Sequence, residues 1–328
     1  MVVAAGGARL PRHPRARAQM VPATLRTAAR QRLASGAVRL PPVGLWTSAL
    51  DRQPASVVRE AVGEIEELGY GALWVGEAVR REAFANASLL LAASQRLIVA
   101  TGIANIWARD PVTMAAGHRT LAEAWDERFV LGIGVSHAPL VNPRGHDYGK
   151  PLSMMRDYLD GMDLAPYEAP PPASTTRVLA ALGPRMLSLA AERADGAHPY
   201  FVPVEHTAEA RSVLGPGKLL CPEAAVVVEA DPDTAREVAR RHVGTYLKLP
   251  NYVNNLLRLG FNDADVAGAG SDRLVDALVG WGGVDTVAGR VRAHLDAGAD
   301  HVAVQVLTAD PTELPRREWR QLADALLP

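Results

Sequence analysis

The sequence predicts an α/β protein with the fold of a (β/α)8 TIM barrel. Short apolar runs alternate along the chain with longer segments of helical periodicity, the order that a parallel sheet covered by helices requires. There are eight such runs, and the alternation extends over more than ~250 residues, the usual length of one barrel. An open, doubly wound sheet is the alternative fold.

The predicted strands are mainly apolar, as expected of parallel strands that are buried on both faces. They are 43–46, 72–75, 97–101, 128–135, 177–182, 197–200, 223–228 and 301–307. Gly132-x-Gly134 in the fourth strand resembles the start of a dinucleotide-binding fingerprint, but the third glycine is missing and no helix begins there. The barrel is therefore preferred over the open sheet.

Helical segments occupy most of the chain between these strands. Proline and glycine mark many of their ends, and one apolar face recurs with helical spacing. The predicted helices are 54–68, 84–93, 111–124, 151–162, 183–194, 232–246, 250–259, 272–279, 284–297 and 315–327. The irregular stretch 142–176 and the additional helix 250–259 exceed one helix per strand, so we expect insertions after strands 4 and 7.

The N-terminal 40 residues differ in composition from the rest of the chain. They contain eight Arg and no acidic residue, and they lack the continuous apolar core of a secretory signal. We expect residues 1–40 to be a disordered Arg/Ala/Pro-rich extension or sequence upstream of the true start, rather than a functional basic arm. Residues 41–328 are then a single barrel domain.

Composition excludes several classes of protein. The extension leaves 27 of the 35 basic residues and all 36 acidic residues in the barrel, a net charge of −9, which argues against nucleic acid as a partner. A single cysteine, Cys221, excludes an internal disulfide and fits a reducing, cytoplasmic location. No apolar run is long enough to span a membrane, and no His or Cys spacing predicts a metal site.

The stretch 97–111 is the most informative part of the sequence. An apolar strand is interrupted by Gly102, and Asn105 and Trp107 follow before Pro111 begins a helix. A glycine at the end of a buried strand indicates close approach of another group to the backbone or an unusual conformation. We expect a cofactor to lie against the main chain here.

Active sites of barrels of this kind lie at the C-terminal ends of the strands. His137 follows the fourth strand, where an imidazole could exchange a proton near neutral pH. From the sequence alone, a loop histidine that is hydrogen-bonded to backbone is an equally good interpretation. Glu77 follows the second strand and could orient a ring nitrogen or hydroxyl, or be solvated. Trp46 follows the first strand and could line a flat pocket or belong to the core.

Two further regions are candidates for ligand contacts. Gly183-Pro184-Arg185-Met186 begins a helix after a strand, and its exposed N–H groups suit a phosphate as well as they suit an ordinary helix start. His198 and Tyr200 end the sixth strand, and Tyr252 in the inserted helix could cover the pocket or cap a surface helix. We expect these three side chains to contact substrate.

These strand-end segments together resemble the luciferase-like monooxygenase superfamily, in particular its deazaflavin-dependent oxidoreductases. The resemblance covers 41–307, and the matching segments are 73–77, 101–105, 128–137, 182–186 with 194–196, and 297–302. It implies coenzyme F420 in the barrel mouth, with FMN as the alternative cofactor. It also implies a bulge at Gly102-Ile103, often with a non-proline cis peptide, behind the middle ring of the coenzyme.

The resemblance also assigns roles to individual residues. It places His137 where a relative has a proton-donating carboxylate, and Glu77 beside the ring; relatives carry a catalytic His where this chain has Ala78. It implies a homodimer. The residues expected to bind the coenzyme are Trp46, Glu77, Gly102, Ile103, Ala104, Asn105, Val135, Ser136, Gly183, Pro184, Arg185 and Met186.

Three hypotheses of function follow. The first is an oxidoreductase that transfers a hydride between coenzyme F420 and a small organic substrate, with His137 as the proton-exchanging residue. The second is an FMN-dependent monooxygenase that uses O2. The third is a coenzyme-binding relative without catalytic activity.

Overall fold

The structure is a computed structural model that describes residues 38–328. Most of the expected N-terminal extension, residues 1–37, lies outside the described residues. Two of the last residues expected in it contact the barrel: the Val38 N–H donates to the Thr176 hydroxyl at 2.9 Å, and Leu40 is buried. In this structure the barrel domain therefore includes residues that precede Pro41.

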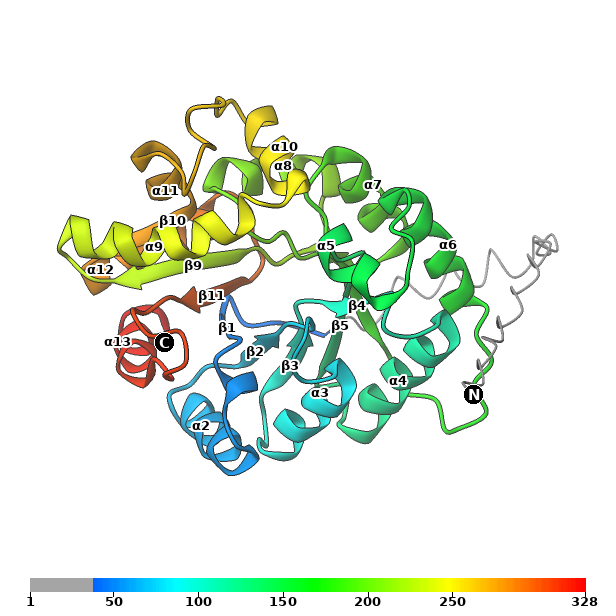
Figure 1. Cartoon of the computed structure of the whole chain (residues 1–328). Coiled ribbons are helices and arrows are strands. Elements are labelled where there is room, and N and C mark those ends of the chain that lie inside the picture. Colours follow the sequence, from blue (N-terminus) through cyan, green and yellow to red (C-terminus); the bar gives the residue numbers. More distant parts are fainter. Residues whose placement is uncertain (1–37) are drawn as a thin grey trace, which may run out of the picture. The chain divides into compact units, whose positions relative to one another are not determined.

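The strands form one parallel sheet that curls around a central axis (Figure 1). Its neighbours follow chain order from β1 to β7, and β11 pairs with β1. The bounds of these strands are β1 Val43–Trp46, β2 Ala72–Val75, β3 Ile98–Thr101, β4 Ala104–Asn105, β5 Phe129–Gly134, β6 Thr176–Leu179, β7 Gly196–Ala197 and β11 Val302–Val306. All eight predicted strands lie at these positions or in the segment described next.

A single run of chain, β8 Leu219–Leu220 followed by β9 Glu223–Val228, closes the barrel. Its first half bonds to β7, because the N–H groups of Cys221 and Glu223 donate to Ala197 and Pro199. Its second half pairs with β11 in register from Glu223 opposite Ala303. The ring of strands is thus closed through this segment, which connects β7 with β11.

The barrel interior is filled by a few large side chains between small ones. Trp74 is fully buried, donates its indole N–H to His301 at 2.9 Å, and stacks on His198 with 4.4 Å between ring centroids. Small residues around them make the space, since a Cβ on Gly44 would stand 2.7 Å from the His301 ring. The interior is therefore a packed core beneath the barrel mouth, as in other barrels of this type.

Helices cover the outside of the sheet (Figure 1). Their bounds are α2 Ala55–Glu67, α3 Ala83–Ala92, α4 Pro111–Ala124, α6 Pro151–Asp163, α7 Pro184–Arg193, α8 Val204–Leu214, α12 Val284–Asp296 and α13 Arg316–Leu326. Proline opens α4, α6 and α7, where its missing N–H costs nothing. Most of the predicted helices are found within one or two residues of their expected ends.

Both segments for which we expect insertions carry additional elements. After β5 the chain forms α5 Ala138–Val141 and η3 Asn142–Arg144 before α6. After β9 it forms α9 Pro232–Tyr246, α10 Pro250–Arg258, α11 Asp272–Leu278 and the strand β10 Val279–Gly282, which pairs with the upper half of β9. A second apolar cluster, separate from the main core, unites this region; it includes Phe201, Val227, Val238 and Leu256.

Helix α8 and strand β10 are among the elements that were not predicted from the sequence. Helix α8 was missed because His206 and Thr207 lie on its buried face, where apolar residues are expected; Thr207 bonds to His294 at 2.8 Å. Strand β10 was missed because two of its four residues are glycine and the predicted helix 272–279 ran into it. It pairs with β9, which is distant in the sequence.

Candidate active site

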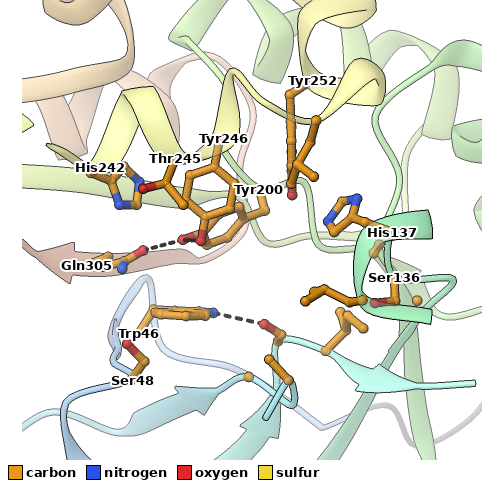
Figure 2. A pocket seen from close by; sticks show the side chains of 18 of the residues that line it. Trp46, Ser48, Ser136, His137, Tyr200, His242, Thr245, Tyr246, Tyr252 and Gln305 are labelled. Carbon is orange, nitrogen blue, oxygen red and sulfur yellow. Dashed lines mark hydrogen bonds between the residues drawn. The ribbon is translucent and has the colours of Figure 1, made fainter. Parts of the chain in front are cut away.

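A deep pocket opens at the C-terminal ends of the strands, with a cavity volume of about 1070 Å³ (Figure 2). It is larger than one drug-sized ligand needs, so it has room for a cofactor and a second molecule. Most of the residues predicted from the sequence lie in its walls: Trp46, Glu77, Gly102, Ile103, Val135, Ser136, His137, Gly183, Met186, His198, Tyr200 and Tyr252.

The floor of the pocket is the interrupted third strand. The peptide bond between Gly102 and Ile103 is cis, as the resemblance implies. Gly102 donates its N–H to Val75 at 2.7 Å, and its carbonyl accepts from the indole N–H of Trp46 at 3.3 Å. A Cβ on Gly102 would stand 2.6 Å from that indole nitrogen, so only glycine fits. The backbone and the Trp46 ring thus form a flat, apolar surface.

Glu77 holds this floor in place. Its backbone N–H donates to Ile103 at 3.2 Å, and its carboxylate accepts from the Asn105 N–H at 2.7 Å and the Ala83 N–H at 3.1 Å. The same carboxylate forms a bidentate ion pair with Arg109, and both side chains are only 6% exposed. These partners occupy the carboxylate of Glu77.

Two residues expected to bind the coenzyme lie behind the floor rather than in the pocket wall. Ala104 and Asn105 are buried and pair with Ile133 and Gly134 of β5. The side chain of Asn105 accepts from the Trp107 N–H at 3.0 Å. Their positions support the floor from below.

His198 lies at the bottom of the pocket and is almost fully buried. Its Nδ1 lies 2.6 Å from the carbonyl of Cys221 and so carries the proton, which leaves Nε2 as a buried acceptor without a partner among the described residues. Burial lowers the pKa of His198 to about 4, against the opposing hydrogen bond to Cys221. The imidazole is therefore neutral at pH 7.

His137 lies in the wall beside the end of β5 (Figure 2). Ser136, which precedes it, has the left-handed backbone conformation with φ of 56°, and its carbonyl accepts from the Tyr148 hydroxyl at 3.0 Å. His137 Nδ1 lies 3.1 Å from the Asn251 side-chain oxygen, and its ring lies against Tyr252. Burial lowers the pKa of His137, although the bond to Asn251 opposes this shift.

The segment 183–186 begins α7 as predicted. Gly183 and Met186 line the pocket, whereas Pro184 and Arg185 are exposed and outside its lining. A Cβ on Gly183 would meet nothing within 4 Å. The first turn of α7 therefore presents open space beside backbone N–H groups at the pocket edge.

The wall opposite His137 is built from tyrosines and one glutamine (Figure 2). The Tyr200 hydroxyl lies 2.8 Å from that of Tyr246 and donates to the Gln305 side-chain oxygen at 2.9 Å. The rings of Tyr200 and Trp46 are 5.3 Å apart. Tyr252 contacts Tyr246 edge to face, so Tyr252 belongs to this aromatic wall.

Several pocket residues were not predicted from the sequence: Asp51, His242, Tyr246, Asn251 and Gln305. Gln305 was detectable, because it is the only polar residue in an otherwise apolar final strand and follows Ala303 on the inner face. The others lie on a 3-10 turn and on α9 and α10, whose folding over the barrel no local pattern reveals. Burial is the main cause that raises the pKa of Asp51 to about 6.

Two general features of the described residues bear on the chemistry. No group of three His, Cys, Asp or Glu side chains within residues 38–328 could hold a metal ion. Over the same residues, no helix is both long and apolar enough to cross a membrane.

The family model described as luciferase-like monooxygenase matches residues 40–301, most of the chain. The chain belongs to this family. It is thus a member of a family of oxidoreductase enzymes, and the resemblance seen in the strand-end segments is confirmed.

One curated relative of this luciferase-like protein comes from Mycobacterium tuberculosis (strain ATCC 25618 / H37Rv), and is provisionally named a coenzyme F420-dependent oxidoreductase. It is 27% identical over 191 residues, which cover 48% of the present chain and 55% of the relative. The match thus spans about half the length of that relative.

Solved structures confirm the barrel fold. An F420-dependent secondary alcohol dehydrogenase, bound to an F420-acetone adduct, has a TM-score of 0.71 at 13% identity, over 88% of this chain and 98% of that one. The F420-dependent tetrahydromethanopterin reductase of Methanopyrus kandleri has a TM-score of 0.67 at 14% identity, over 88% and 99%. An FMN-bound Baeyer–Villiger monooxygenase constituent from Pseudomonas putida has a TM-score of 0.63 at 15% identity, over 87% and 96%.

Proposed function

We propose that this protein is an oxidoreductase that transfers a hydride between coenzyme F420 and a small organic substrate. The observation that carries the proposal is the flat backbone floor at Gly102–Ile103, set in a pocket large enough for a coenzyme and a substrate together. The names of the Mycobacterium tuberculosis relative and of two structural neighbours support F420 as the coenzyme.

The residues present fit such a coenzyme. Trp46, Gly102 and Ile103 would lie against its ring system. Gly183 would lie beside its phosphate, because any other residue would fill with its side chain the open space that the phosphate needs. The N–H groups of Gly183 and Arg185, which bond to no other group among residues 38–328, would bind the phosphate oxygens. When bound, the deazaflavin supplies the hydride chemistry, and the protein supplies position and proton exchange.

His137 is suited to accept a proton. Its Nδ1 carries the hydrogen that bonds to Asn251, which leaves Nε2 with a lone pair that can accept a proton. The lowered pKa keeps the ring neutral at pH 7, as a general base requires. We propose that His137 takes the proton released when a substrate is oxidised, and returns it in the reverse direction.

A binding titration tests the cofactor. The purified protein is titrated with oxidised coenzyme F420 and, separately, with FMN. Micromolar or tighter binding of F420 alone is expected. Preference for FMN, with oxygen consumption on addition of reduced FMN, would instead indicate the monooxygenase hypothesis, and tight F420 binding without turnover of any substrate would indicate a non-catalytic binder.

Matched glycine variants test where the phosphate binds. Gly183 and Gly283 both precede helices in extended conformation, with φ of −81° and −64°, and a Cβ on either meets nothing within 4 Å. Only Gly183 lines the pocket. Gly183→Val is expected to weaken F420 binding at least tenfold, whereas Gly283→Val leaves it unchanged. Equal affinities of the two variants would remove α7 from the site.

A further inference from the structure

The end of the pocket opposite His137 contains one side chain with an uncommitted polar group. Gln305 lies on the inner face of β11, is 8% exposed, and lines the pocket. A polar side chain buried among the apolar residues of a barrel strand is costly unless its donors and acceptors are used. The partners of its two amide atoms therefore matter.

A neighbouring hydroxyl engages the oxygen of this amide. The Tyr200 hydroxyl has one proton, and it donates this proton to the oxygen of Gln305 at 2.9 Å. At 2.8 Å, Tyr246 must then be the donor to Tyr200. The oxygen of Gln305 is thereby committed, and its amide nitrogen is left on the side that faces Trp46 and Ser48 (Figure 2).

The nitrogen itself has no protein partner within residues 38–328. No hydrogen bond from it is formed in this part of the chain, although Trp46 and Ser48 also line the cavity. Two N–H donors thus stand at this end of the pocket, which Trp46 and Ser48 also line. This arrangement suits an acceptor oxygen on a flat or apolar molecule.

The groups around Gln305 are uncharged at neutral pH. Burial raises the pKa values of Tyr200 and Tyr252 well above their ordinary range and lowers the pKa of His242 to about 4. Burial also raises the pKa of Glu223, beneath the tyrosines, to about 8. A charged group placed here would lose its hydration without gaining a counter-charge, so this end of the pocket disfavours ions.

The charged side chains of the pocket are paired with other protein groups or exposed. Asp51 accepts from Asn86, Glu77 pairs with Arg109, and Arg258 pairs with Glu209. Arg80, Arg241 and Lys248 line it but are exposed, and Arg241 donates to the carbonyl of Ala309 at 2.7 Å. They lie at the rim, where water remains available. The closed end and the rim therefore differ in the chemistry they offer.

We infer that the closed end of the pocket binds an uncharged substrate, and that the amide N–H of Gln305 bonds to its carbonyl or hydroxyl oxygen. Tyr200 and Tyr246 are positioning residues that keep the amide nitrogen turned toward the substrate. The inference rests on the proposed function, since it names the substrate class of the same site. His137 and Gln305 lie on opposite sides of the pocket (Figure 2).

Three probes of similar size separate the contributions. Acetophenone is an uncharged ketone, benzoate carries a charge, and ethylbenzene has no oxygen. Binding of each is measured by calorimetry or ligand-observed NMR, with and without coenzyme F420. Acetophenone is expected to bind about three- to tenfold more tightly than ethylbenzene, the range of one hydrogen bond, and more than tenfold more tightly than benzoate.

Variants assign the preference to the amide. Gln305→Leu is expected to bind acetophenone and ethylbenzene equally, with ethylbenzene affinity unchanged. Tyr200→Phe frees the amide to turn and lowers the preference for the ketone in part. Gln321→Leu, which changes an exposed glutamine of α13, is the control and changes nothing. Retained F420 affinity shows that each variant is folded.

The outcomes separate this inference from the proposed function. Tighter binding of benzoate than of acetophenone, a ketone preference that survives Gln305→Leu, or binding of none of the probes would overturn the inference, whatever F420 does. A ketone preference that depends on Gln305 in a protein that binds no F420 would uphold the inference and overturn the proposed function.

Discussion

The ion pair behind the pocket floor gives a strong test of the structure. Glu77→Gln keeps the shape of the side chain but removes the charge that faces Arg109, and it places an amide N–H among donors. Arg109 would retain only Glu82, whose side chain is 48% exposed. Removal of one partner from a buried ion pair lowers the free energy of unfolding by about 3–5 kcal/mol. Because Arg109 keeps the Glu82 carboxylate as a partner, we expect a loss near the lower limit, about 3 kcal/mol.

Urea unfolding of the coenzyme-free protein measures this loss. A change of about 3 kcal/mol corresponds to a midpoint lower by about 1 M if the denaturant slope is near 3 kcal/mol/M. Glu60→Gln is the control, since Glu60 pairs with Arg316 but is 68% exposed, and its loss stays below about 1 kcal/mol. Equal losses for the two variants would refute the assignment of Glu77 as a buried anchor.

A double variant separates charge from packing. Glu77→Gln combined with Arg109→Met removes the uncompensated guanidinium, so it is expected to recover part of the stability lost by Glu77→Gln alone. A double variant less stable than either single variant would mean that the pair contributes mainly through packing. Because the Glu77 carboxylate also bonds to the Asn105 N–H, both variants are expected to bind F420 more weakly.

Three further predictions follow from the site and its support. Gly132→Ala is expected to prevent stable folding, because its Cβ would stand 1.9 Å from a backbone oxygen, whereas Gly289→Ala on an exposed helix face stabilises by about 1 kcal/mol; urea midpoints test both. His137→Ala lowers turnover by about 10²- to 10⁴-fold with F420 affinity retained, and exposed His146→Ala does not; unchanged turnover would remove His137 from the mechanism. Burial raises the pKa of Asp51 from its ordinary value of 3.8 to about 6 in the folded protein, so its stabilising contribution is complete below about pH 4 and lost as pH rises through 6. Asp51→Asn should therefore become more stable relative to the unmodified protein over that range, and a constant difference from pH 4 to 7 would contradict the raised pKa.

The barrel was predictable because its signals are local. Each strand from Val43–Trp46 to Glu223–Val228 is an apolar run bounded by glycine, proline or charge, and proline marks the first turn of several helices. The floor of the pocket was predictable for a similar reason, since Gly102 interrupts a buried run. Its exact partners, Trp46 and Val75, are distant in sequence and needed the fold.

The opposite wall was only partly predictable. Tyr200 and Tyr252 were expected near substrate, but their connection to Gln305 through Tyr246 depends on how α9 and α10 fold over the barrel. Arg185 shows the reverse case: the sequence places it beside a helix start, and the structure leaves it exposed outside the pocket lining. A local motif gives the position of a residue along the chain, whereas the direction in which its side chain points depends on the residues that pack around it in the fold.

The split pairing of β9 has a consequence for how this enzyme could change. Its residues 223–226 pair with β11 in the barrel, and its residues 225–228 pair with β10, beside which α9 and α10 pack on a separate apolar cluster. The floor at Gly102 rests on the first five strands, whereas Tyr246 and Tyr252 rest on this added layer. Substitutions in the added layer can therefore reshape substrate preference while the coenzyme surface stays intact, so the two specificities can evolve or be engineered separately.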